Sequence, residues 1–341
     1  MKPSVQEIKE IRLAHGGGGT LSQRLLHELI IPVLGNPLLN TLDDSVLLPD
    51  PGSRLAFTTD SFVVQPLFFP GGDIGRLAVC GTVNDLAMAG AVPKYISLGM
   101  ILEEGFPVAD LKTVIGSVRA AAEEAGVLVV AGDTKVVEKG KADGIFINTA
   151  GIGMVPANKT VSASLAAPGD AVLVSGSLGR HGMAVLSSRE GLGIRTAISS
   201  DVAPLNHLVF SLMESCEGVH SLRDATRGGL AAVLNEIAVS SGVGIELDER
   251  SIPVGEDVQA ACDLLGFDPL YVANEGVFAV VMDQREADHA VQILKGFEYG
   301  RNAARIGRVS KESPGRVTLR TNLGTCRIID PLSGEQLPRI C

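Results

Sequence analysis

An amphipathic helix followed directly by two apolar strands limits the folds open to this chain more than any other feature. The helix is predicted over residues 110–127, DLKTVIGSVRAAAEEAGV. Its apolar residues recur at the spacing of a helix that packs on a core, with these on one side: Leu111, Val114, Ile115, Val118 and Ala122. The runs VLVVAGDTKVV (127–137) and GIFINTAGIGMV (144–155) then have the composition of strands. Strand-like runs occur along the chain both singly and in groups, so the sequence predicts an α+β fold.

The chain is long enough for two domains. At 341 residues it exceeds what one hydrophobic core usually serves. Hydrophobic residues make up 45% and charged residues 20% of the chain, which predicts a well-packed globule. A turn-rich stretch, PANKTVSASLAAPGD, precedes a new strand, AVLVSG. We expect a glycine-rich N-terminal segment (1–40), an N-terminal domain (41–157), a C-terminal α+β domain (158–328) and a tail (329–341).

Charge and cysteine content argue against several classes of protein. The chain has 39 acidic and 29 basic residues, a net charge of −10, and no basic run, so we expect no binding to nucleic acid. No stretch approaches the ~18–20 apolar residues of a membrane span, and the N-terminus does not resemble a signal peptide. The five cysteines are scattered. We therefore expect no disulfide framework or zinc site, no membrane association, and a cytoplasmic protein.

Several aspartates lie in apolar surroundings, where burying a charged carboxylate without a partner is energetically unfavourable. Asp60 and Asp133 end apolar strands, and Asp85, beside Asn84, interrupts an apolar helix. Three more lie in other polar segments: Asp43, Asp44 and Asp224. Any single one is most simply explained as a turn residue or a helix cap. Together they favour a site for Mg²⁺ and phosphates, because Mg²⁺ prefers oxygen ligands.

A glycine run and two charged residues add to this set. The run HGGGGT near the N-terminus is a candidate phosphate cradle, although no Gly-Lys-Ser/Thr follows as in a Walker A loop. It contains Gly17, Gly18 and Gly19. Lys135 and Glu275 lie in apolar company. Lys135 is explicable as an ion-pair partner of Asp133, and Glu275 as a turn residue, but burial can also tune the pKa of either for proton transfer.

The chain ends LPRIC, with the thiol of Cys341 as its last side chain. Turn-forming residues dominate before it. Fully extended, residues 331–341 would reach roughly 36 Å at ~3.3 Å per residue. The tail is therefore long enough to carry the thiol into a neighbouring site.

Seven segments, taken in order, resemble the HypE family of hydrogenase maturation factors, the carbamoyl dehydratases. They are HGGGG, TTDSF, VNDLAMAGA, GDTKVV, RDATRGGL, DPLYVANEG and the terminal PRIC. The resemblance covers essentially the whole chain, and its specificity lies in the combination with a C-terminal cysteine. Two positions depart from the family pattern. Ala225 replaces a proline, and Arg180 precedes His181 where many relatives have GDHG, so we assign no role to that position.

The resemblance implies a two-domain, aminoimidazole-ribonucleotide-synthetase-like fold, in which the N-terminal halves of a homodimer pair into a β-barrel and ATP binds near the interface. It also implies a reaction. A carbamoyltransferase, HypF, loads a carbamoyl group onto Cys341, and the chain uses ATP to dehydrate the S-carboxamide to an S-thiocyanate. The cyanide then passes to iron on the HypC–HypD complex and becomes a ligand of the [NiFe]-hydrogenase.

This chemistry assigns expected roles to the candidate residues. Those expected to bind ATP and Mg²⁺ are Gly17, Gly18, Gly19, Asp43, Asp44, Asp60, Asn84, Asp85, Asp133, Thr134, Asp224 and Arg227, of which Asp44, Asp60, Asp85 and Asp224 are the metal ligands. Cys341 is the carrier, and Lys135 and Glu275 are alternative bases for the nitrogen protons. We expect a mobile tail, which has to leave the site to meet its partners, and a thiol pKa near ~8.5.

Three other functions remain open. A selenophosphate-synthetase-like enzyme uses a reactive cysteine ahead of its glycine loop, where this chain has His15 and no cysteine before Cys80. A purine-type synthetase shares the ATP chemistry but has no use for a C-terminal thiol. A scaffold that binds nucleotide and presents its tail to partners, without catalysis, is also compatible with the sequence.

Overall fold

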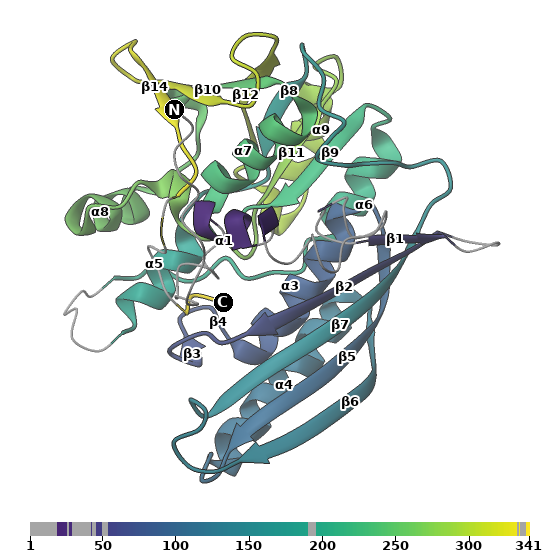
Figure 1. Cartoon of the computed structure of the whole chain (residues 1–341), viewed down its shortest axis with the longest axis vertical. Coiled ribbons are helices and arrows are strands. Elements are labelled where there is room, and N and C mark those ends of the chain that lie inside the picture. The colour runs from purple at the N-terminus through teal and green to yellow at the C-terminus, as the bar shows by residue number, and fades with distance from the viewer. Residues whose placement is uncertain are drawn as a thin grey trace.

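Two β-sheets organise the chain, one within residues 46–155 and the other within residues 171–329. Figure 1 shows the two sheets as two lobes, with the C-terminus between them. Most strand neighbours are antiparallel and helices pack on both sheets, so the predicted α+β fold is confirmed. The structure is a computed structural model and describes residues 19–25, 27–28, 42, 46–49, 54–189, 196–332, 334 and 339–341.

The first sheet has the strand order β1-β2-β7-β5-β6. Its strands are β1 (Val46–Pro49), β2 (Arg54–Phe62), β5 (Val92–Glu103), β6 (Leu128–Val137) and β7 (Ile145–Val155). All neighbours are antiparallel except β5 and β6. Helix α4 (Val108–Ala125) joins this parallel pair, as a crossover connection must. A small hairpin of β3 (Phe68–Phe69) and β4 (Gly72–Asp73) leads into helix α3 (Ile74–Met88).

Helices α3 and α4 cover one face of this sheet (Figure 1). Helix α3 begins at Asp73, whose side chain accepts hydrogen bonds from the N–H groups of Gly75 and Arg76 and so caps the helix. Gly75 permits close packing, because a Cβ there would lie 2.4 Å from the Val114 carbonyl oxygen of α4. The prediction that Ile115 lies on the buried side of α4 is wrong, since this side chain is 44% exposed. It is rotated about 100° from Val114, whereas the buried stripe continues through Val118, Ala121, Ala122 and Ala125.

The opposite face of the first sheet carries exposed apolar side chains. Phe57 of β2 is paired with Ile152 of β7, Ile152 with Tyr95 of β5, and Tyr95 with Leu128 of β6. These four residues, which we call the apolar row, are 37–64% exposed. A continuous apolar surface of this kind marks an interaction site more often than a free surface. This face is therefore a candidate interface.

The second sheet has the strand order β14-β13-β10-β12-β8-β11-β9. Its strands are β8 (Ala171–Val174), β9 (Val219–Asp224), β10 (Gly244–Asp248), β11 (Phe278–Met282), β12 (Ala304–Ser310), β13 (Val317–Arg320) and β14 (Cys326–Ile329). Helix α7 (Gly229–Ser241) packs on one face, and α6 (Asn206–Ser215) and α9 (Ala287–Lys295) on the other. None of the described helices is long and apolar enough to cross a bilayer.

Two further helices join the domains. Helices α5 (Arg180–Ser187) and α8 (Glu256–Leu265) contribute to the same hydrophobic core as α3 and α4. The remaining short elements are α1 (Thr20–Leu25), η4 (Glu249–Ser251), η5 (Pro269–Tyr271) and η6 (Glu298–Gly300). The shared core fixes the two domains against each other and so defines the space between them.

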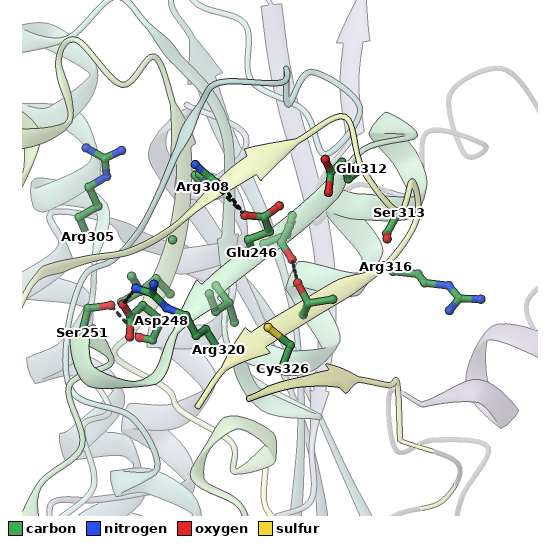
Figure 2. A pocket seen from close by; sticks show the side chains of 15 residues that line it. Glu246, Asp248, Ser251, Arg305, Arg308, Glu312, Ser313, Arg316, Arg320 and Cys326 are labelled. Atoms are coloured by element: carbon green, nitrogen blue, oxygen red, sulfur yellow. Dashed lines mark hydrogen bonds and ion pairs between the residues drawn. The ribbon is translucent and has the colours of Figure 1, made fainter. Parts of the chain in front are cut away.

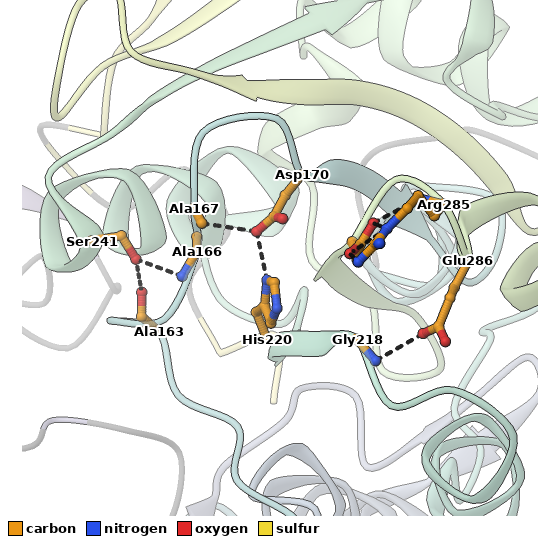
Figure 3. A network of polar contacts seen from close by, with 10 residues as sticks. Ala163, Ala166, Ala167, Asp170, Gly218, His220, Ser241, Arg285 and Glu286 are labelled. Carbon is orange, nitrogen blue, oxygen red and sulfur yellow. Dashed lines mark hydrogen bonds and ion pairs between the residues drawn. The ribbon is translucent and has the colours of Figure 1, made fainter.

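The segment that connects the two sheets is bonded to the second domain (Figure 3). The Ser241 hydroxyl of α7 donates to the Ala163 carbonyl at 2.7 Å and accepts from the Ala166 N–H at 3.0 Å. A carboxylate oxygen of Asp170 lies 2.7 Å from Nδ1 of His220 on β9. The turn-rich stretch is therefore an ordered connection rather than a free linker.

Candidate active site

A polar pocket with a volume of about 230 Å³ lies where the two domains meet the C-terminus. Six of the residues singled out from the sequence line it: Asp60, Asp85, Asp224, Arg227, Glu275 and Cys341. The other lining residues are Thr58, Thr59, Phe62, Gly81 and Thr226. The pocket thus brings together residues that are up to 283 positions apart (58 to 341) in the chain.

Strand β2 and helix α3 place two carboxylates on one wall. Successive residues of a strand face opposite sides of the sheet, and Asp60 lies on the same side of β2 as buried Phe62, toward α3. Asp85 on α3 accepts a hydrogen bond of 2.8 Å from the Thr58 hydroxyl. Burial raises the pKa of Asp60, although the guanidinium of Arg227 acts to lower it. A strand and a helix far apart in sequence thus present adjacent acidic groups.

The opposite wall comes from the end of β9. Asp224 is the last residue of this strand and is 5% exposed. Burial raises its pKa to about 6, and the nearby charge of Asp60 acts in the same direction. Arg227 follows in the next turn, with Nη2 3.7 Å from Oδ1 of Asp60. Ala225, at a position that departs from the family pattern, donates its N–H to the Val277 carbonyl at 2.9 Å, a bond that proline cannot make.

Glu275 is the most deeply placed acid of the pocket. It is 3% exposed, and its Oε1 has no hydrogen-bond partner among the described residues. Burial raises its pKa well above the ordinary value, and the charges of Asp224, Asp60 and Asp201 raise it further. Asp201, which the sequence analysis did not single out, accepts the Glu275 N–H at 3.2 Å, and burial raises its own pKa to about 6. Mutually repelling carboxyl groups with an unpaired buried oxygen fit a site that binds cations.

Asn84, predicted as a cofactor ligand, holds main chain in this structure. It is 1% exposed and is not part of the pocket lining. Its Nδ2 donates to the carbonyls of Ala203 (3.1 Å) and Glu275 (3.3 Å), and its Oδ1 accepts from the Leu205 N–H (2.8 Å). Asn84 therefore fixes the position of Glu275.

Cys341 reaches the pocket because the chain end docks beside the end of β2. The N–H of Val63 donates to a main-chain oxygen of Cys341 at 3.2 Å, and the N–H of Gln65 donates to the carbonyl of Arg339 at 3.0 Å. Burial raises the pKa of the Cys341 thiol to about 12, although Arg227 acts to lower it. The expected thiol pKa near ~8.5 is wrong for this docked position, because burial disfavours the thiolate by more than Arg227 stabilises it.

Three predicted site residues lie on β6, away from the pocket: Asp133, Thr134 and Lys135. Asp133 is in register with Gly99, Asn148 and Ser61 across β5, β7 and β2. Three strand spacings of ~4.8 Å place it about 14 Å from β2. Because Ser61 follows Asp60, Asp133 also lies on the opposite face of the sheet. Within one chain these three residues therefore do not reach the pocket. The sequence could not show this, because the residue pattern of a strand does not reveal the strand's place in the sheet.

The glycine run is described at its last residue only. Four predicted residues lie outside the described part of the chain: Gly17, Gly18, Asp43 and Asp44. Gly19 is buried against the base of the tail, where a Cβ would lie 2.2 Å from the Leu332 carbonyl oxygen. The N–H of Thr20 donates to this same oxygen at 2.7 Å. Gly19 thus contacts the chain that leads to Cys341.

The predicted magnesium ligands do not form a complete site by themselves. Among the residues that the structure describes, no group of three or more His, Cys, Asp or Glu side chains is arranged to hold a metal ion. Asp60, Asp85 and Asp224 line one pocket, whereas Asp44 lies outside the described residues. The three pocket carboxylates would need further oxygen ligands, which phosphates commonly supply for Mg²⁺.

Another cavity, of about 750 Å³, is lined mainly by residues of β10, β12 and β13 of the second sheet (Figure 2). Two of the carboxylates that line it are already paired, Glu246 with Arg308 at 2.7 Å and Asp248 with Arg320, and Glu312 is a third. These side chains are exposed enough for water to screen them. This cavity is larger than the pocket around Cys341, but its ion pairs are exposed to solvent. The pocket around Cys341 contains buried carboxyl groups with raised pKa values, and it is therefore the candidate active site.

Two family models match the chain. The AIR synthase related protein N-terminal domain matches residues 42–155, and the AIR synthase related protein C-terminal domain matches residues 167–320. The fold and the site thus define a two-domain protein of the AIR synthase related class.

Individual relatives are much more similar. The carbamoyl dehydratase HypE of Cupriavidus necator is 52% identical over 332 residues, which are 97% of this chain and 95% of that protein. A HypE solved in a HypE-HypF complex superposes with a TM-score of 0.86 at 51% identity, over 90% of this chain and 99% of that one. A hydrogenase maturation protein HypE solved in complex with ATP gives 0.82 at 47% identity, over 96% and 98%. The chain belongs to the HypE family of carbamoyl dehydratases.

Proposed function

We infer that this chain is the ATP-dependent carbamoyl dehydratase of hydrogenase maturation, and that it converts an S-carboxamide on Cys341 to an S-thiocyanate. The observation that carries this inference is the position of the terminal thiol. Cys341 lines a pocket together with Asp60, Asp224, Arg227 and Glu275. A free-substrate synthetase has no use for its own C-terminus in this place. The cyanide formed here becomes a ligand of the hydrogenase iron.

ATP and Mg²⁺ are the cofactors that suit this pocket. A HypE 47% identical to this chain is solved in complex with ATP. We assign Asp60, Asp85 and Asp224, with Asp44, to Mg²⁺, and Arg227 to the phosphates, because cations at the phosphates stabilise the charge of phosphoryl transfer. ATP would supply the phosphoryl group that makes the carboxamide oxygen a leaving group.

The chain's own residues perform the remaining tasks. Forming C≡N from the carboxamide removes its oxygen and both nitrogen protons, so the site needs a base. Glu275 is the candidate within the pocket, held in place by Asn84. Because the carboxamide stays tethered to Cys341, its local concentration is high without tight binding.

Several partners follow from this reaction. A related HypE is solved in a complex with HypF, and we propose that HypF loads the thiol of this chain. Because docked Cys341 is half-buried and the pKa of its thiol is raised, we propose that the tail leaves the pocket for loading. We further propose that the HypC–HypD complex receives the cyanide on its iron and that these steps take place in the cytoplasm.

Mass spectrometry of the C-terminal peptide tests this function. The chain would be incubated with carbamoyl phosphate, Mg²⁺, the carbamoyltransferase and either ATP or a non-hydrolysable ATP analogue added after loading. We expect the peptide to gain one carbamoyl group and then to lose one water only with ATP. An unmodified Cys341, with ATP consumed on a free small molecule, would instead indicate a synthetase of another kind.

Asp60→Asn separates catalysis from a scaffold role. The amide removes one anionic oxygen from the cation site and the charge opposite Arg227. We expect single-turnover dehydration of a loaded tail to slow by about tenfold or more, the scale of one interaction with a charged group. Binding to the carbamoyltransferase should not change when it is measured by gel filtration of the complex. Dehydration at the unchanged rate would contradict a role for Asp60 in catalysis.

We propose that the chain forms a homodimer through the apolar row, with the first sheets of two copies facing each other as a β-barrel. The row spans four strands on the sheet face opposite α3 and α4, and its side chains are exposed among the residues that the structure describes. Asp133 and Lys135 lie on this face, so any contribution from them to a site would be made at or across the dimer interface. This arrangement accounts for their distance from Cys341 in one chain.

Ile152→Glu tests the dimer. A carboxylate in the middle of the apolar row would be buried without a partner, which is strongly unfavourable. We expect sedimentation equilibrium to give twice the chain mass for the unmodified protein and the single-chain mass for the variant. Leu264→Glu, at a 72% exposed position of α8 outside the row, is the matched control and should remain dimeric. A wild type of single-chain mass would overturn the proposed dimer.

A further inference from the structure

The last three residues are held in place through their main-chain oxygens, although Arg339 has the left-handed backbone of a turn (φ 55°). Their main-chain oxygens accept hydrogen bonds from Gln65 N–H and Arg189 Nη2 (to Arg339, both 3.0 Å), from His181 Nε2 (to Ile340, 2.8 Å) and from Val63 N–H (to Cys341, 3.2 Å). Ile340 also buries its side chain, which is 4% exposed. Main-chain hydrogen bonds of this kind hold peptides in place whatever their side chains.

His181 differs from the other donors because it is a fully buried side chain with both ring nitrogens engaged. It is 0% exposed, and its Nδ1 lies 2.8 Å from the Ser200 hydroxyl. A carbonyl oxygen only accepts, so Nε2 must carry the hydrogen bonded to Ile340, and Nδ1 accepts from Ser200. The ring also packs edge-on against Phe69, with centroids 5.3 Å apart. Ser200 and Phe69, neither of which belongs to the tail, therefore help to fix the ring.

We propose that His181 is a positioning residue for the dehydration, which acts by holding the Ile340 carbonyl and so the adjacent Cys341 in the pocket. The proposal rests on the proposed function. One peptide unit separates the bonded carbonyl from the residue that carries the thiol, so a fixed donor restricts where the sulfur can lie. Loss of this donor leaves a buried carbonyl unpaired whenever the tail docks, which favours the undocked tail.

Alkylation of Cys341 measures docking without ATP, HypF or catalysis. The full-length chain is treated with iodoacetamide, and the rate is read from the C-terminal peptide by mass spectrometry. His181→Asn keeps an acceptor near the Ser200 hydroxyl but cannot reach Ile340, whereas His181→Gln places an amide N–H near the position of Nε2. We expect about tenfold faster alkylation of Cys341 in His181→Asn, as for a lost buried hydrogen bond, and a rate within about twofold of wild type in His181→Gln.

A second cysteine separates positioning from general destabilisation. Cys80 lies in α3 and is 0% exposed, so its alkylation reports opening of the core in the same sample. We expect the Cys80 rate to stay unchanged in both variants, and His220→Asn, at a histidine in the second domain, to leave Cys341 protected.

Either of two results would overturn the proposal. In one, His181→Asn leaves the Cys341 rate unchanged; in the other, His181→Gln exposes Cys341 as much as His181→Asn does. Equal acceleration at Cys80 would likewise assign the effect to the core. Because alkylation needs no dehydration, these outcomes are independent of the proposed function. If dehydration occurs, the variant in which Cys341 is less protected from alkylation should also dehydrate a loaded tail more slowly in a single turnover. His181→Asn should therefore be slower than His181→Gln.

Discussion

Replacing Cys341 with alanine is expected to abolish transfer of the carbamoyl group to this chain and all cyanide formation that depends on it. The sulfur is the atom to which the carbamoyl carbon is bonded, and alanine offers no nucleophile in its place. With the carbamoyltransferase, carbamoyl phosphate, ATP and Mg²⁺ present, the intact mass of the Cys341→Ala chain should remain unchanged. The wild type should gain one carbamoyl group and then lose one water.

Cys326 provides the matched control. It is the exposed cysteine of the described residues, on β14 of the second sheet. Cys326→Ala should be loaded and dehydrated like the wild type, although its thiol is the more accessible of the two in the docked state. A carbamoyl group found on Cys341→Ala, or lost with Cys326→Ala, would refute the tethered carrier at the C-terminus.

The elements of the first domain follow from the sequence because their patterns are local. The predicted helix over 110–127 and strands over 127–137 and 144–155 correspond to α4, β6 and β7. The order of the strands in the sheet cannot be predicted from local patterns in this way. Nothing in the run containing Asp133 indicates that β6 pairs in parallel with β5 at the edge of the sheet, because pairing depends on residues far away in the chain.

The residues of the candidate site likewise divide into those that the sequence indicates and those that only the fold reveals. The sequence indicates Asp60 and Asp85 because each is a carboxylate in apolar company, and for Asp60 that mismatch persists in the fold as burial with a raised pKa. Asp224 lies in a polar segment of the sequence, and only the fold shows that burial raises its pKa as well. His181 and Asp201 gave no such signal. Their roles depend on the Ile340 carbonyl and the Glu275 N–H, and these contacts arise only when distant segments fold together.

The docked tail separates the two halves of the reaction cycle. In the pocket, burial raises the thiol pKa to about 12, and the thiolate is the reactive form. We therefore propose that loading takes place on an undocked tail, where the thiol would regain its ordinary pKa.

Glu275→Gln is expected to slow dehydration of a loaded tail by at least about 100-fold, within the range for loss of a general base. The amide keeps the shape of the side chain but cannot take a proton from the carboxamide nitrogen. Glu275 lines the pocket with Cys341, and its Oε1 has no partner among the described residues. Single-turnover mass spectrometry of the C-terminal peptide measures the rate, and the Cys341 alkylation rate should show that docking is unchanged.

The stability of the same variant distinguishes lost chemistry from lost structure. Because the folded-state pKa of Glu275 is raised, the stability that its protonated form contributes is complete below the unfolded pKa near 4.5 and is lost as pH rises toward the folded value. Glutamine does not ionise, so the melting temperature of Glu275→Gln should fall less than that of wild type as pH rises. A stable variant with slow dehydration identifies Glu275 as the base. If it dehydrates at the wild-type rate while Lys135→Ala does not, Lys135 is the base, and it must then reach the tail from a second chain.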